Sequence, residues 1–119
     1  MAEETGNTGM FDALVEDLQD NSGIPFAECE WATRPTGNFG TIQIDFSGAS
    51  DNGDDGKIEQ AVEGSVDLYL RGGRDAAAVR KVTDILRAHC GASWRKNSQQ
   101  YERETHLLHI EFVFQLEEE

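Results

Sequence analysis

Two segments of the chain repeat apolar residues at the three- and four-residue spacing of an amphipathic helix. The first is predicted over residues 10–21, and its apolar positions are Met10, Phe11, Leu14, Val15 and Leu18. The second is predicted over residues 75–89, and its apolar positions are Ala78, Val79, Val82, Ile85 and Leu86. Asp75 suits the start of the second helix and Gly91 its end, because Asp caps free N–H groups and Gly adopts the backbone turn that ends many helices.

Five further segments alternate apolar and polar residues, as strands with one buried face do. They are predicted over residues 26–33, 39–46, 59–70, 92–101 and 105–116. A cluster of Pro and Gly at residues 34–38 predicts that the first two strands form a hairpin, and the last two are predicted to form another. Residues 47–56 hold three Gly and three Asp, which predicts an exposed loop.

The resulting order, α-β-β-β-α-β-β, predicts an α+β fold. Strands in hairpins are antiparallel, and two helices can cover one face of a sheet, so we expect a two-layer sandwich with a mostly antiparallel sheet. Residues 1–9 are polar and are expected to form a flexible N-terminal arm, and residues 10–119 a single domain. Eight residues are predicted to share the core, namely Val66, Leu68, Val79, Val82, Leu86, Ile110, Phe112 and Phe114.

Charge is segregated along the chain. The 119 residues carry 23 acidic and 10 basic side chains, for a net charge of −13. Residues 1–70 hold 15 acids against two basic residues, residues 71–103 hold eight basic residues against three acids, and residues 104–119 hold five acids and no Lys or Arg. Such segregation fits self-association through opposite faces, and it fits equally a chain whose helices and strands simply differ in surface charge.

The sequence offers no catalytic, cofactor-binding or metal-ligating set. On a strand, His106 and His109 point to opposite faces and cannot hold one metal together. His89 and Cys90 are neighbours at a helix end, which does not make a nucleophile and base. A calcium loop beginning at Asp51 fails, because its third and twelfth positions are Gly53 and Val62.

Other features predict the cellular setting. Cys29 and Cys90 are both expected to be small buried residues rather than a disulfide. The N-terminus is acidic where a secretory signal would be basic, and no apolar run reaches the ~20 residues of a membrane helix. We therefore expect a protein that stays in the cytoplasm where it is made and has no membrane partner.

From residue 26 onward the sequence resembles a family of small tail proteins of long-tailed bacteriophages, the siphovirus-type tail terminator or tail completion proteins. Three features carry the resemblance: the turn and strand Arg-Pro-Thr-Gly-Asn-Phe-Gly-Thr-Ile at residues 34–42, the acidic loop at 51–55, and Lys-Ile-Glu-Gln-Ala-Val-Glu-Gly-Ser-Val-Asp-Leu-Tyr at 57–69. Members similarly continue into an amphipathic helix and close with a hairpin whose second strand is aromatic-rich, like residues 109–114.

The resemblance implies a non-enzymatic structural protein of the virion, located in the tail or neck and assembled in the cytoplasm of the host bacterium. Subunits of such proteins form a homo-oligomeric ring, usually a hexamer, which caps the tail tube and stops its polymerisation. The implied partners are the chain itself, the major tail tube protein and the head–tail connector protein, with DNA passing through the ring without specific binding. Two alternatives stay open: another neck component or tail-tube subunit, and a small-molecule-binding or enzymatic domain of similar architecture.

A subunit interface is the only functional site that we expect. Acidic groups of the loop, or those on outward strand faces, are predicted to meet basic groups of a neighbour. The predicted interface residues are Asp51, Asp54, Asp55, Arg71, Arg74, Arg80 and Arg87. The basic side of the second helix could instead touch DNA, but it lacks interleaved aromatic residues and belongs to an acidic chain, so we favour the subunit-facing interpretation.

Overall fold

The computed structural model describes residues 5–47 and 60–118 and shows two helices and five strands in these ranges. In chain order they are α1 (Thr5–Asn21), β1 (Phe26–Glu28), β2 (Phe39–Ser47), β3 (Gln60–Arg71), α2 (Ala76–Cys90), β4 (Trp94–Glu102) and β5 (Leu107–Glu118). The order and the α+β class are those predicted from the sequence. The predicted loop at 47–56 lies outside the described residues except for its first residue, which ends β2.

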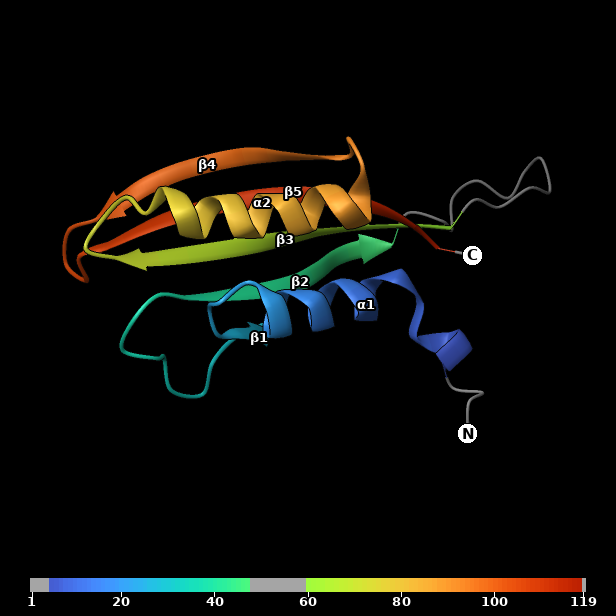
Figure 1. The fold of residues 1–119 in the computed structure, drawn as a ribbon, viewed down its shortest axis with the longest axis horizontal. Helices are drawn as coiled ribbons and strands as arrows, with labels where there is room; N and C mark the ends of the chain where they lie inside the picture. Colours follow the sequence, from blue (N-terminus) through green and yellow to red (C-terminus); the bar gives the residue numbers. More distant parts are fainter. Residues whose placement is uncertain (1–4, 48–59, 119) are drawn as a thin grey trace.

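The five strands form one mixed sheet in the order β1-β2-β3-β5-β4. The pairs β2–β3, β3–β5 and β5–β4 are antiparallel, and β1 alone pairs in parallel, with β2. Both helices lie on one face of the sheet, with α1 beside β1 and α2 over the β3–β5 region (Figure 1). The sheet therefore has one helix-covered face and one helix-free face, and its two edge strands are β1 and β4.

The helix α2 begins and ends where its sequence dictates. The Asp75 carboxylate accepts a hydrogen bond from the Ala78 N–H at 3.1 Å, which satisfies one of the free donors of the first turn. Gly91 ends the helix with a positive φ of 62°, and its N–H donates to the carbonyl of Arg87. Between these ends, the apolar stripe of α2 packs on the sheet, and its basic residues Arg80, Lys81 and Arg87 are exposed.

One hydrophobic core lies between the helices and the sheet. Of the eight residues predicted to share it, seven are buried, and Val79 is partly buried against it. From α1 the core receives Phe11, Leu14, Val15 and Leu18, as their helical spacing predicted, whereas Met10 of the same pattern is exposed. Phe11 stacks on Phe114 of β5 with ring centroids 6.5 Å apart.

The prediction of a first hairpin is wrong. The strand predicted over residues 26–33 ends at Glu28, because Cys29 adopts a positive φ of 69° that breaks the extended backbone. The chain then loops over and enters β2 parallel to β1, with Phe26 opposite Gly40. Trp31, predicted to lie on a strand, instead donates its indole N–H to the Gly40 carbonyl at 3.0 Å. Cys29, predicted to be buried, is exposed at this turn, whereas Cys90 is buried as predicted.

The first helix starts earlier than predicted. It begins at Thr5, but Gly9 has non-helical angles (φ 64°, ψ −170°) that separate a first turn from the rest. The part that packs on the sheet follows this kink, close to the predicted start at residue 10. Of the predicted arm, residues 1–4 lie outside the described residues, and its flexibility stays a prediction.

Candidate functional site

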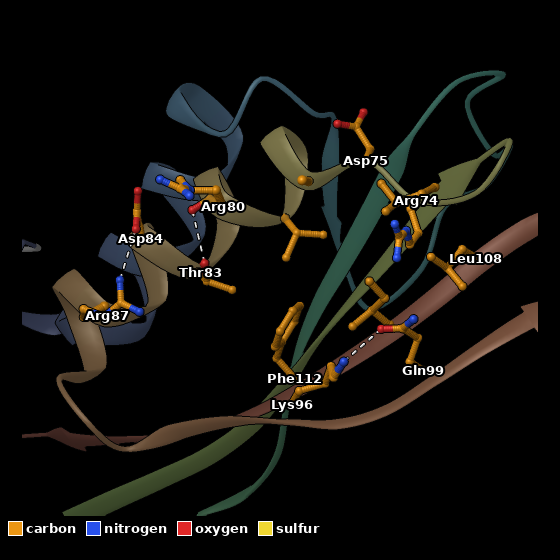
Figure 2. A pocket seen from close by; sticks show the side chains of 14 residues that line it. Arg74, Asp75, Arg80, Thr83, Asp84, Arg87, Lys96, Gln99, Leu108 and Phe112 are labelled. Atoms are coloured by element: carbon orange, nitrogen blue, oxygen red, sulfur yellow. Dashed lines mark hydrogen bonds and ion pairs between the residues drawn. The ribbon is translucent and has the colours of Figure 1, made fainter.

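A groove runs between α2 and the edge strand β4 on the helix-covered face of the sheet. It has a volume of about 850 Å³. The bottom of the opening is apolar and consists of buried core side chains of β3 and β5, among them Leu108 and Phe112 (Figure 2). The floor residues are Leu70, Leu108, Ile110 and Phe112, with Val79 of α2 on the wall.

The rim of the groove is predominantly basic. Arg74, Arg80 and Arg87 project from the α2 side, and Lys96 faces them from β4 (Figure 2). Against these four basic residues stand two acids, Asp75 and Asp84, so the lining carries a formal charge of 4 − 2 = +2 within a chain of −13. Asp75 is engaged as the helix cap. The rim thus presents basic groups to any ligand that reaches the apolar floor.

The basic side chains differ in how firmly they are held. Arg87 pairs with Asp84 at 3.1 Å and lies 5.5 Å from the ring centroid of Trp94, so it is fixed from two sides. Lys96 donates to the Gln99 amide oxygen at 2.9 Å along β4. Among the described residues, Arg74 and Arg80 form no ion pair and are exposed. These two guanidinium groups are therefore free to bind an acidic partner.

The predicted interface residues separate into three groups. Arg74, just before α2, and Arg80 and Arg87 of α2 come together on the groove. Arg71 is exposed at the end of β3 and does not line the groove. Asp51, Asp54 and Asp55 lie outside the described residues.

Sequence reasoning missed the contribution of β4 to the groove. Lys96 and Gln99 reach it because β4 pairs with β5, which places Lys96 opposite Phe112 and Gln99 opposite Ile110. The hairpin of β4 with β5 was predicted and is confirmed, but the packing of α2 beside this hairpin was not predicted. The sequence signal that could have indicated this contribution was Lys96, a basic residue on the strand that directly follows the basic helix.

The helix-free face of the sheet carries a second cluster, centred on stacked rings. The Tyr69 ring lies between Phe39 and His109, with centroid distances of 4.7 and 4.3 Å. The Arg34 guanidinium sits 5.0 Å from the Tyr69 centroid and 5.3 Å from that of Phe39. Adjacent positions on β2, β3 and β5 align these rings in one row, so the cluster is a product of register.

His109 is the titratable centre of this cluster. Its Nε2–H donates to the Asp67 carboxylate at 2.7 Å, and Nδ1 lies 3.7 Å from a carboxylate oxygen of Glu102. The hydrogen bond to Asp67 raises the pKa of His109 above its ordinary value of 6.5 against the opposing effect of burial, and the charges of Asp67, Glu102 and Glu111 add to the rise. The protonated ring therefore links β5 to β3 and β4.

This pKa predicts a stability that falls with rising pH. A histidine whose pKa is raised by folding stabilises the fold fully below its unfolded value near 6.5, and that contribution is lost as the pH rises through the higher folded value. We expect His109→Gln to remove this part of the pH dependence while leaving the fold intact. NMR titration of His109 and urea unfolding from pH 5.5 to 8.5 measure it. A His109 pKa at or below 6.5 would contradict the prediction.

Two further groups of the described residues, Asp17 and Cys90, also have shifted pKa values. His89 hydrogen-bonds Asp17 at 2.8 Å and so ties the end of α2 to α1, while bonds from Asn21 and His89 lower the pKa of Asp17. Burial raises the pKa of the Cys90 thiol to about 11. In residues 5–47 and 60–118, no three His, Cys, Asp or Glu side chains gather in a way that could hold a metal ion. Neither helix of these ranges is long and apolar enough to cross a membrane.

The fold has a counterpart among solved structures. The chain is similar to a protein in a structure described as the virion of a native gene transfer agent particle. The match covers 93% of this chain and 92% of the other, with a TM-score of 0.53 and 11% sequence identity. At this identity the likeness is one of fold. No protein-family model matches the sequence, and no curated protein matches it.

Proposed function

We propose that the chain is a structural protein of a phage-type particle, and specifically a tail terminator whose ring caps the tail tube, stops its polymerisation and provides the head–tail joining surface. The observation that carries the proposal is the fold likeness, over nearly the whole of both chains, to a protein of a gene transfer agent virion. The finer assignment to a terminator rests on the sequence resemblance carried by residues 34–42 and 57–69.

Features of the chain itself support an assembly role over a catalytic one. The groove has an apolar floor and a basic rim but no histidine, cysteine or paired carboxylates among its lining residues. Such a surface is suited to contact with protein, because apolar area supplies affinity and the charged rim supplies orientation. Opposite charges on different parts of one subunit also suit the two complementary surfaces that a closed ring of identical subunits needs.

Electron microscopy of the purified protein with tail tubes tests the proposal. We expect rings, predicted to be hexameric, bound at one end of each tube, and tubes that stop growing when the protein is present during polymerisation of the tube subunit. Gold-labelled protein found along the whole tube would instead identify a tube subunit, and label confined to the head vertex would identify another neck component. Tubes of unlimited length with no label at their ends would overturn the terminator assignment.

We also expect no measurable binding to duplex DNA at physiological salt. A ring of six would carry 6 × −13 = −78 charges, and such a field repels phosphate. Nonspecific DNA-binding proteins rich in cations reach dissociation constants of about 10⁻⁴–10⁻⁶ M under these conditions. A gel-shift titration measures this. Micromolar binding that weakens steeply with salt and disappears in Arg80→Glu/Lys81→Glu would assign the basic helix to DNA.

A further inference from the structure

The sheet order places opposite charges on opposite sides of the subunit. The basic groove belongs to the α2–β4 side, and β4 is the last strand of the sheet in that direction. At the other end lies β1, with α1 beside it (Figure 1). In the sheet, β2, β3 and β5 separate β1 from β4, although α1 and α2 pack against each other where His89 hydrogen-bonds Asp17.

The α1–β1 side is acidic. Along α1, Asp12, Glu16 and Asp20 recur every four residues and are all exposed, so they form one stripe on the helix surface. Glu28 and Glu30 are exposed at the end of β1 and just after it. No Lys or Arg occurs before Arg34, and among the described residues no ion pair neutralises any of these five acids. We call this surface the acidic side.

The exposed hydrophobic side chains of the described residues lie on the same two regions. Met10 of α1 is 39% exposed and Ile44 of β2 is 45% exposed, and both belong to the acidic half of the subunit. Tyr101, 51% exposed, lies on β4 at the basic side. Apolar contact can therefore accompany the charge pairing, which matters because exposed ion pairs alone contribute little.

Free strand edges occur at the same places. β4 pairs only with β5, so its outer edge is unpaired in the described chain. β1 pairs with β2 only as far as Ile42, with one further bond from the Cys29 N–H to the Ile42 carbonyl, which leaves the rest of β2 without a strand on that side. Unpaired edges of this kind are common sites of association between chains.

We propose that the α2–β4 groove of one copy of this chain receives the acidic side of a second copy. The contact is head to tail, since each subunit offers a different surface to its two neighbours, and such contacts close into rings when the rotation between subunits allows. The inference deepens the proposed function, because it names the two surfaces that meet between neighbours in the ring. The occupant is a second copy rather than DNA, because the groove floor is apolar and phosphate would be repelled by the chain as a whole.

Charge reversal tests the contact on the whole chain. In Arg74→Glu/Arg80→Glu the groove loses two basic groups that make no ion pair in the described structure, and in Glu16→Lys/Asp20→Lys the acidic stripe is reversed. Each variant should weaken self-association by about tenfold or more, measured by sedimentation at low salt. The variant that combines all four substitutions should recover most of the wild-type affinity, because the charges are again complementary.

A matched control separates the contact from net charge. Arg95→Glu/Arg103→Glu changes the charge by −4, as the groove variant does, but both residues are exposed and lie outside the groove. This control should associate like the wild type, and circular dichroism should show every variant folded. Groove and acidic-side variants that associate like the wild type, or a combined variant that recovers nothing, would overturn the inference.

Two further outcomes distinguish this inference from the proposed function. A groove variant that still self-associates but no longer stops tube growth would assign the groove to the tail tube, overturning the contact while supporting a terminator. A wild-type chain that stays monomeric at millimolar concentration and low salt would also overturn the contact, and the tube-capping experiment would then decide the proposed function alone.

Discussion

Phe112→Ala should lower the free energy of unfolding by about 3–5 kcal/mol, the range for truncating a buried phenylalanine. Phe112 is 2% exposed and lies at the centre of β5, opposite Val66 of β3. The Trp94 ring meets it edge-on with centroids 6.0 Å apart, so truncation leaves a cavity beneath α2 and removes an aromatic contact. A loss of this size is a large share of the ~5–15 kcal/mol that stabilises a typical domain.

Val113→Ala is the matched control for this experiment. Val113 is the next residue of the same strand, but it points to the helix-free face and is only half-buried. Its truncation should cost about 1 kcal/mol or less. Urea unfolding of both variants gives the comparison. Equal losses in the two would mean that the two faces of β5 do not differ in burial as the structure shows.

The substitution Phe112→Ala is expected to affect the groove as well as the stability of the fold. Phe112 also forms part of the groove floor, so the substitution changes the shape of the proposed contact as well as the core. A stability measurement on the isolated chain should therefore be made at low protein concentration, where association does not add to the free energy of unfolding. Self-association of this variant would depend both on the loss of core packing and on the change in the groove floor, so the proposed contact is tested with the charge-reversal variants instead.

The order of elements could be predicted because its signals are local. Helical spacing over residues 10–18 and 78–86 and alternation along 107–116 each depend on neighbours a few residues away. The same alternation identified the core face of β5 correctly. The error at β1 has a different origin, since one residue, Cys29, takes a left-handed backbone conformation that its type rarely adopts. No pattern of apolar and polar positions carries that information.

The candidate site could be predicted only in part, for a related reason. Arg80 and Arg87 belong to one helical segment and Arg74 comes just before it, so their proximity followed from the sequence. Lys96 joins them from β4, whose hairpin with β5 was predicted, but the packing of α2 beside that hairpin was not. The stacked row of Phe39, Tyr69 and His109 draws one residue from each of three strands, and only the register brings the three rings together. The alternation of apolar and polar residues predicts which face of the sheet such a residue lies on, but it does not predict which residues of different strands are neighbours.

Gly64→Ala should also destabilise the fold strongly, although it adds a single methyl group. Gly64 lies in the middle of β3 between Ile44 of β2 and Phe114 of β5. A Cβ at this position would clash with the carbonyl oxygen of Gln43 and would lie 2.6 Å from Cζ of Phe114. We expect a loss of about 1–3 kcal/mol, the usual cost of overpacking a well-packed site.

The two groups that a Cβ at Gly64 would meet differ in how easily they can move. The Phe114 ring could move, at the expense of its stacking on Phe11, but the Gln43 oxygen belongs to the backbone of β2 and cannot move without distorting the sheet. Combining Gly64→Ala with Phe114→Leu should therefore not restore stability. Gly37→Ala is the control, because nothing lies within 4 Å of a Cβ at that position, and its effect should stay within about 0.5 kcal/mol. Thermal and urea unfolding measure all three variants, and a Gly64→Ala protein as stable as the Gly37→Ala control would show that β2 and β3 are not paired as closely as this register requires.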